Sequence, residues 1–118
     1  MSGNYDVRFE MIGDVPVIYI SGDMTSDADS AVVKIFREIK AKAGVAKVIF
    51  NFSETNYINS AGLATLINVI QEMEKVEGRV VFAGLTTHFQ KVMDIVGITE
   101  FVKISDTNEG AVALLEED

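Results

Sequence analysis

The sequence predicts an α/β fold: a single domain with a mixed sheet of about five strands, an N-terminal β-hairpin and about four helices. Three observations predict it. Apolar and charged residues alternate over residues 5–11, an apolar run occupies residues 45–52, and helical periodicity fills the segments between the later strands. Since strand and helix alternate after the hairpin, helical crossovers should link the later strands. The domain should occupy residues 1–118, with its core between about residue 5 and residue 115.

The hairpin is predicted from a half-buried strand and the turn that follows it. Apolar residues alternate with charged ones from Tyr5 to Met11, which is the period of a strand with one wet face. Gly13-Asp14 suits a tight turn, and the apolar residues 15–21 form the second strand. We expect a polar connection over residues 22–27.

Two long helices are predicted on either side of a buried strand. The first covers residues 28–43, and Ser26 or Asp27 can cap it. Gly44 ends that helix, and residues 45–52 are dense in β-branched and aromatic side chains. Such a strand is typically buried on both faces, so it should be central. The second helix covers residues 61–76 and ends before Gly78.

The last third of the chain repeats strand and helix. Residues 79–83 and 101–104 are predicted as strands. Each precedes a capping-box pattern, Thr87-x-x-Gln90 for the third helix and Asp106-x-x-Glu109 for the fourth. Gly97 should close the third helix.

Composition excludes several classes of function. The chain has 118 residues, 48% of them hydrophobic, and a net charge of −8 from 10 basic and 18 acidic side chains. The basic residues form no stripe, so DNA and RNA are not expected partners. No apolar run approaches the roughly 20 residues that span a bilayer, and the N-terminus lacks the layout of a signal peptide. We therefore expect a cytoplasmic protein with no membrane partner.

The candidate chemical groups do not form an enzyme motif. The chain has no cysteine and one histidine, His88, which we expect on the surface of the third helix. Ser60 and His88 lack the G-x-S-x-G context of a hydrolase, and phosphate-cradling glycine loops are missing. The carboxylates of Asp23, Asp27 and Asp29 suit helix capping, although they also suit a partner surface. We expect no catalytic residue, no metal and no cofactor.

Ser60 is the most informative residue. It follows an apolar run and immediately precedes a long helical pattern, within Asn59-Ser60-Ala61-Gly62-Leu63. A hydroxyl at a helix N-terminus faces unpaired N–H groups and the positive end of the helix dipole, which favour a phosphate there. Alternatively, Asn59 or Ser60 is simply the N-cap of the second helix. The pattern alone leaves both interpretations open.

From Tyr5 to about Leu115, the chain resembles the STAS-domain anti-sigma factor antagonists of bacteria. Three stretches carry the resemblance: residues 18–24, 48–63 and 78–101. The middle stretch is the specific one, because Ser60, Gly62 and Leu63 are similar to the family motif Asp-Ser-Ser/Thr-Gly-Leu. The chain departs from the family where Asn59 replaces the aspartate and Ala61 the second hydroxyl residue. It also departs at Gly22-Asp23-Met24-Thr25, which lacks the final acid of Gly-Glu-Leu-Asp.

The resemblance implies a STAS-like domain that acts by partner switching. The unphosphorylated protein would bind an anti-sigma factor serine kinase, phosphorylation of Ser60 would release it, and a metal-dependent serine phosphatase would reset it. The alternative is a non-switching STAS scaffold or adaptor in a signalling or lipid-transport complex. The expected partner-binding residues lie in three segments: Asp23, Met24, Thr25, Asn59, Ser60, Ala61, Gly62, Leu63, Thr86 and Thr87. Gly62 either lets a partner approach closely or permits tight packing of the helix start.

Overall fold

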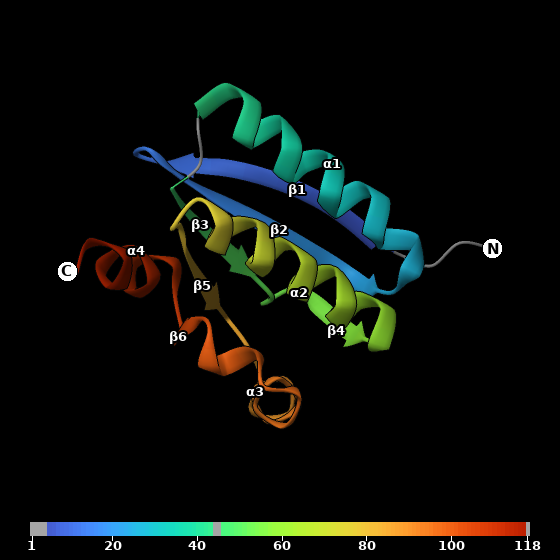
Figure 1. The fold of residues 1–118 in the computed structure, drawn as a ribbon. Helices are drawn as coiled ribbons and strands as arrows, with labels where there is room; N and C mark the ends of the chain where they lie inside the picture. The colour runs from blue at the N-terminus through green and yellow to red at the C-terminus, as the bar shows by residue number, and fades with distance from the viewer. Residues whose placement is uncertain (1–4, 44–45, 118) are drawn as a thin grey trace.

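The computed structural model describes residues 5–43 and 46–117 (Figure 1). Its strands and helices follow one another in this order: β1 (Tyr5–Ile12), β2 (Val15–Met24), α1 (Ser26–Ala43), β3 (Lys47–Asn51), β4 (Thr55–Ile58), α2 (Ser60–Lys75), β5 (Arg79–Ala83), α3 (Thr87–Val96), the 3₁₀ helix η1 (Ile98–Glu100), β6 (Lys103–Ser105) and α4 (Asn108–Glu116). The predicted α/β fold with an N-terminal hairpin is confirmed. The predicted stop of the first helix at Gly44 lies outside the described residues.

The strands form one mixed sheet in the order β1-β2-β3-β5-β6, with β4 paired to β2. The hairpin pairs β1 with β2 antiparallel, and Gly13, with φ at +63°, lies in its turn. The remaining pairs are parallel, which requires crossover connections between the paired strands. The carboxyl ends of β2, β4 and β5 therefore point toward the same edge of the sheet.

Two separate cores lie on the two faces of the sheet. On one face, Phe50, Phe52 and Phe82 meet with ring centroids 5.0 to 6.5 Å apart, beneath α1 and α2. On the other face, α4 covers Ile49 and Val81. Figure 1 shows α1 and α2 side by side on one face and α4 on the other. Because β3 contributes to both cores, the prediction of a central strand buried on both faces is confirmed.

The sixth strand, β4, was not predicted, and it changes the end of β2. The expected polar connection at residues 22–27 is wrong at its start, because β2 continues to Met24 in register with Ile58 of β4. Gly22, with φ at +82°, and a register shift beside it let the strand continue past the hairpin. As a result, β4 replaces β3 beside β2 and carries the chain toward the start of α2.

Several element boundaries are off by one or two residues. Thr86 caps α3 and Thr107 caps α4, each accepting a hydrogen bond from the N–H three residues later, so the predicted boxes at Thr87 and Asp106 are displaced by one residue. Each box lies next to a threonine whose hydroxyl makes the actual cap. The last strand begins at Lys103, because η1 occupies the preceding turn and leaves Phe101 61% exposed.

Candidate functional site

The start of α2 is anchored by Asn59. The Asn59 side chain takes the N-cap position, and its Oδ1 accepts a hydrogen bond of 2.9 Å from the backbone N–H of Gly62. Its own backbone N–H donates to the carbonyl oxygen of Met24, at 3.2 Å. The first turn of α2 is therefore fixed both to its cap and to the last residue of β2.

Gly62 brings that first turn against β2. A Cβ atom at Gly62 would overlap the carbonyl oxygen of Met24 and would lie 3.1 Å from the Ile58 side chain. Gly62 is also buried. Of the two roles considered for this glycine, the packing contact is the one that the geometry supports, since no partner could reach its Cα without displacing β2.

Ser60 is the first residue of α2, and it is exposed. Because Asn59 makes the cap, the Ser60 hydroxyl has no capping hydrogen bond, and no other partner for it occurs among the described residues. The hydroxyl therefore stands at the positive end of the helix dipole without a structural role of its own. This geometry is open to an enzyme that modifies the side chain.

The surroundings of Ser60 contain no positive charge from the adjoining segments. Neither the first turn of α2 nor the paired residues 22–24 and 55–58 include a lysine or an arginine. The nearest charge in the strand register is that of Asp23, which lies opposite Tyr57. Tyr57 is 54% exposed, so it offers a large aromatic surface three residues before Ser60. Sequence analysis did not single out Tyr57, because it lies in the apolar pattern just before the helix start.

The predicted partner-binding residues differ widely in exposure. Ser60, Thr86 and Thr87 are exposed, whereas Met24 and Gly62 are buried. The residues of intermediate exposure are Asp23, Thr25, Asn59, Ala61 and Leu63. Met24 is fully buried in the core under α1, so its side chain offers no surface to a partner. Its contribution is the carbonyl oxygen that holds Asn59.

The segment between β2 and α1 is organised by Thr25 and Asp29. The Thr25 carbonyl oxygen accepts from the N–H of Ala28 at 3.0 Å, so Thr25, rather than Ser26 or Asp27, begins the capping of α1. Asp29 accepts a hydrogen bond from the hydroxyl of the buried Thr65 in α2. The Asp29 carboxylate therefore ties the two helices together, which supports its structural interpretation.

Thr86 and Thr87 lie at the same edge of the sheet as Ser60, but their loop packs against a different segment. Thr86 accepts from the N–H of Phe89 at 3.0 Å, and Gly84, with φ at +73°, lies against Ser53. This loop thus packs beside the turn between β3 and β4. Within the described ranges, no hydrogen bond links either threonine to residues 59–63. The structure therefore places the two predicted segments at one edge without joining them.

The turn that leads into β4 is held by Glu54. Its backbone carbonyl oxygen accepts from the N–H of Gly22 at 2.9 Å, and its carboxylate accepts from Ser21 and Arg8. These contacts fasten the turn to the hairpin on the face opposite α1 and α2. They fix the path of β4 and thereby the position of Asn59 and Ser60.

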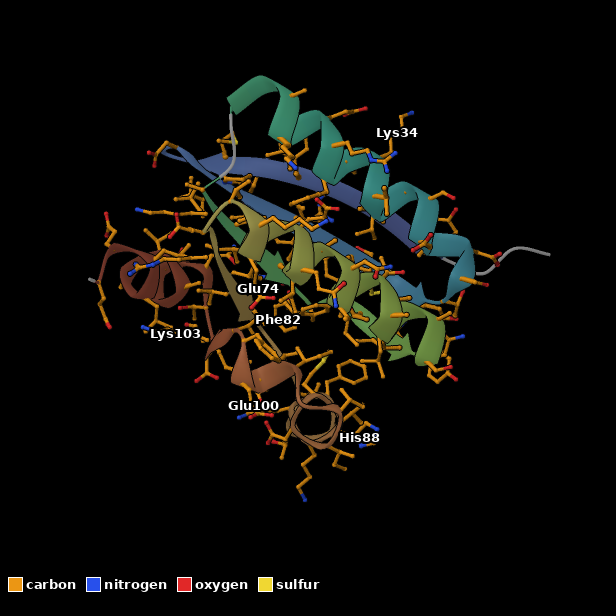
Figure 2. All side chains as sticks on the ribbon, viewed as in Figure 1. Lys34, Glu74, Phe82, His88, Glu100 and Lys103 are labelled. Atoms are coloured by element: carbon orange, nitrogen blue, oxygen red, sulfur yellow. The ribbon has the colours of Figure 1, made fainter. Side chains whose placement is uncertain are left out.

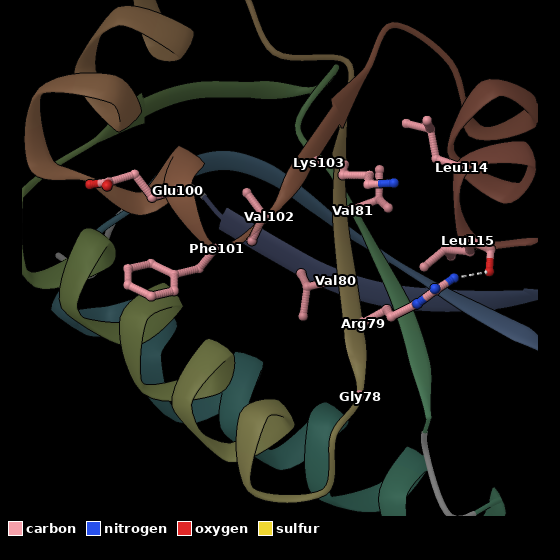
Figure 3. Close-up of a pocket in the computed structure, with 10 residues that line it drawn as sticks. All are labelled: Gly78, Arg79, Val80, Val81, Glu100, Phe101, Val102, Lys103, Leu114 and Leu115. Atoms are coloured by element: carbon pink, nitrogen blue, oxygen red, sulfur yellow. Dashed lines mark hydrogen bonds between the residues drawn. The ribbon is translucent and has the colours of Figure 1, made fainter. Parts of the chain in front are cut away.

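Other surface features lie away from Ser60. A hollow of about 270 Å³ lies beside Arg79 and Lys103, at the amino-terminal ends of β5 and β6 (Figure 3), whereas Ser60 follows the carboxyl end of β4. Arg79 there donates to the carbonyl oxygen of Leu115 at 2.8 Å. His88 is exposed on α3, as expected (Figure 2). In the described part of the chain, no cluster of three or more His, Asp or Glu residues suits a metal ion.

Comparison with known proteins identifies the family. A family model for the STAS domain matches residues 6–111. BtrV of Bordetella bronchiseptica, provisionally described as an anti-sigma factor antagonist, is 29% identical over 70 residues, which cover 59% of this chain and 60% of that protein. The match thus spans less than two thirds of that relative's length.

Two solved structures share the fold. The anti-sigma factor antagonist SpoIIAA in its unphosphorylated form matches 96% of this chain and 100% of its own, with a TM-score of 0.77 and 20% identity. Bacillus SpoIIAA in its phosphorylated form matches 94% of this chain and 100% of its own, with a TM-score of 0.75 and 20% identity. With the family model extending over all six strands to the start of the last helix, the chain belongs to the STAS domain family.

Proposed function

We propose that this STAS domain is an anti-sigma factor antagonist that changes partners when Ser60 is phosphorylated. The observation that carries the proposal is the position of the Ser60 hydroxyl. Ser60 is the exposed first residue of α2, and its hydroxyl makes no capping hydrogen bond because Asn59 caps the helix. The likeness to BtrV, and to SpoIIAA in two phosphorylation states, supports the same function.

A phosphate at Ser60 would alter the surface without unfolding the domain. The N-terminus of a helix tolerates an anion, since its free N–H groups and dipole favour negative charge. The modification adds about −1.5 to −2 charges at neutral pH. The paired segments next to Ser60 contain no lysine or arginine that could form an ion pair with the phosphate. The added charge would therefore face an incoming partner and oppose the contact made by the neutral serine.

The replacement of the usual aspartate by Asn59 is compatible with this role. Asn59 caps α2 through a side-chain oxygen, which is the same function that a carboxylate would perform. The substitution removes a negative charge next to Ser60, so a phosphate meets less repulsion. The helix that begins at Ser60 therefore keeps a side-chain cap, as it would in an Asp-Ser sequence.

In this proposal the domain is a ligand and a substrate, not a catalyst. Its partners are an anti-sigma factor serine kinase and a metal-dependent serine phosphatase, and it works in the cytoplasm. The contact surface consists of the exposed start of α2 with Tyr57, Asp23 and Thr25 around it. None of the helices in the described ranges is long and apolar enough to cross a membrane.

The test is phosphorylation in vitro followed by binding. The purified chain is incubated with ATP and candidate anti-sigma serine kinases, and intact mass with site mapping shows whether Ser60 gains one phosphoryl group. Calorimetry then compares the kinase affinity of the wild type with that of Ser60→Ala and Ser60→Asp. We expect the alanine variant to bind without being phosphorylated and the aspartate variant to bind more weakly.

Ser26→Ala is the matched control, because Ser26 is also an exposed serine and the first residue of a helix. This variant should be phosphorylated and should bind like the wild type. Phosphorylation that persists in Ser60→Ala, or equal kinase affinity for the wild type and Ser60→Asp, would count against the switch.

A further inference from the structure

A concentration of positive charge lies in a groove between α1 and α2, toward the end of α2 that is away from Ser60. The groove has a volume of about 450 Å³ and is lined by residues 33–40 of α1 and 68–75 of α2. Three of the chain's 10 basic residues line it, namely Arg37, Lys40 and Lys75, against one carboxylate, that of Glu72. In a protein with a net charge of −8, this local excess of positive charge runs against the overall balance.

The charges balance in the hollow next to the groove. This hollow shares Val33 and Arg37 with the groove and is also lined by Lys34, Asp29 and Glu38, so two basic residues meet two carboxylates. Figure 2 shows Lys34 on α1. A broad flat anionic surface would therefore meet carboxylates as well as cations, whereas a narrow segment lying in the groove would meet mainly cations.

The groove has little apolar surface of its own. Phe36 and Val69 beneath it are almost completely buried in the core, and the half-buried Val33 is the lining apolar residue that keeps an accessible side chain. The Lys40 and Lys75 ammonium groups lie 3.7 and 3.6 Å from the carboxylate of Glu72. Two ammonium groups thus share one carboxylate, so the three residues keep a net positive charge that can attract an anion from a partner. Both ion pairs are exposed, so they contribute little to folding.

We propose that this groove is a docking site for an acidic amphipathic helix of a partner protein. An apolar stripe of that helix would lie on Val33 and on the aliphatic stems of the basic side chains, and its flanking carboxylates would reach the ammonium groups of Lys40 and Lys75. Lys75 lies about 22 Å from Ser60 along α2, and Asn68, the lining residue of α2 closest to Ser60 in sequence, lies about 12 Å from it. The groove is therefore a separate surface that does not include Ser60.

The test uses a synthetic amphipathic peptide of Glu, Ala and Leu, longer than the roughly 15 residues at which isolated helices become stable. A second peptide with Gln in place of Glu tests the need for negative charge. We expect the acidic peptide to bind the wild type, with perturbed backbone NMR signals confined to residues 33–40 and 68–75. The Gln peptide should bind more weakly, and added salt should weaken only the acidic peptide.

Charge reversal in and outside the groove gives a matched comparison. The double variant Lys40→Glu with Lys75→Glu should bind the acidic peptide about tenfold more weakly. Lys91→Glu with Lys103→Glu makes the same change in net charge at exposed positions outside the groove, and it should bind like the wild type. Glu72→Gln should bind roughly twofold to fivefold more tightly, because it leaves two ammonium groups without their shared carboxylate.

Three results would overturn the proposal. The first is no binding of the acidic peptide to the wild type, and the second is equal weakening in the two double variants. The third is binding of the wild type, but not of the groove variant, to phosphatidylglycerol vesicles in a sedimentation assay, which would assign the groove to a membrane surface. The peptide experiment measures binding in the groove, whereas the kinase assay measures phosphorylation of Ser60. A negative peptide result would therefore overturn the docking proposal without contradicting partner switching.

Discussion

Arg8 and Glu54 form a two-pronged ion pair, with the Nη1 and Nη2 atoms of the guanidinium 3.0 and 3.2 Å from the two carboxylate oxygens. Arg8 belongs to β1, at the edge of the sheet, and Glu54 to the turn before β4. The guanidinium also lies over the ring of Tyr19, 4.3 Å from its centroid. The pair therefore joins the edge of the hairpin to the segment that leads into Ser60.

This ion pair predicts a dependence of stability on acid pH. Hydrogen bonds from Arg8, and then from Ser21, lower the pKa of Glu54 from its ordinary value of 4.5 to about 2. Because the folded-state pKa is depressed, the stabilisation is complete above pH 4.5 and is lost as the pH falls toward 2. Glu54→Gln should therefore lower the melting temperature at neutral pH, and this difference from the wild type should shrink through that pH range.

Thermal unfolding of both proteins across the range measures the effect. Glu109→Gln is a suitable control, because Glu109 is an exposed carboxylate in the first turn of α4, without an ion pair among the described residues. A difference between wild type and Glu54→Gln that stays constant from neutral to strongly acid pH would show that the pair does not stabilise the fold.

Gly62 should be intolerant of any side chain. In Gly62→Ala, the new methyl group would overlap the carbonyl oxygen of Met24, which is backbone and cannot turn aside. We expect a loss of about 1–3 kcal/mol in the free energy of unfolding, the range for overpacking in a tight interior. Ala64→Ser, at an exposed position two residues later, should change stability by less than about 0.5 kcal/mol. Urea unfolding compares the two, and equal stability would place the start of α2 farther from β2.

The same contacts show what could be predicted from sequence and what could not. The alternation in the hairpin and the apolar run of β3 were enough to place both elements, because each pattern is local. β4 was missed because Thr55 and Asn56 interrupt the apolar pattern, and its strand pairing with Gly22–Met24 is a long-range contact. Burial of Met24 was missed for a related reason, since its sequence neighbours are polar.

The candidate site also combines features that local sequence predicts with features that depend on long-range contacts. The helix start at Asn59 and Ser60 was predictable from cap chemistry, although only the geometry decided which of the two residues makes the cap. The exposure of Tyr57 could not be predicted, because an aromatic residue in so short a strand is compatible with either face of β4. The Glu54 contacts join residues more than thirty positions apart, so no local sequence pattern predicts them.

Asn59 should be replaceable by aspartate but not by alanine. Asn59→Ala removes the acceptor of the Gly62 N–H bond and should cost about 1 kcal/mol, the usual loss for an N-cap. Asn59→Asp keeps an acceptor at that position and places a negative charge at the positive end of the helix, so its stability should stay within about 0.5 kcal/mol of the wild type. Chemical unfolding of the three proteins measures the difference. A cost for aspartate as large as that for alanine would contradict the capping role.

Tyr57 should be a main contributor to partner affinity if the proposed function holds. It is 54% exposed and lies three residues before Ser60, and exposed tyrosines often dominate interface energies because they bury a large surface at a low entropy cost. Tyr57→Ala should weaken kinase binding by at least about tenfold, equivalent to about 1.4 kcal/mol, while the free energy of unfolding changes by less than about 0.5 kcal/mol.

Phe101→Ala is the matched control, since Phe101 is 61% exposed and follows η1, outside the segments around Ser60. Calorimetry with the kinase that phosphorylates Ser60 gives both affinities. If the Phe101 variant lost as much affinity as the Tyr57 variant, the partner would have to cover far more of the domain than the start of α2, and the contact surface proposed around Ser60 would be wrong.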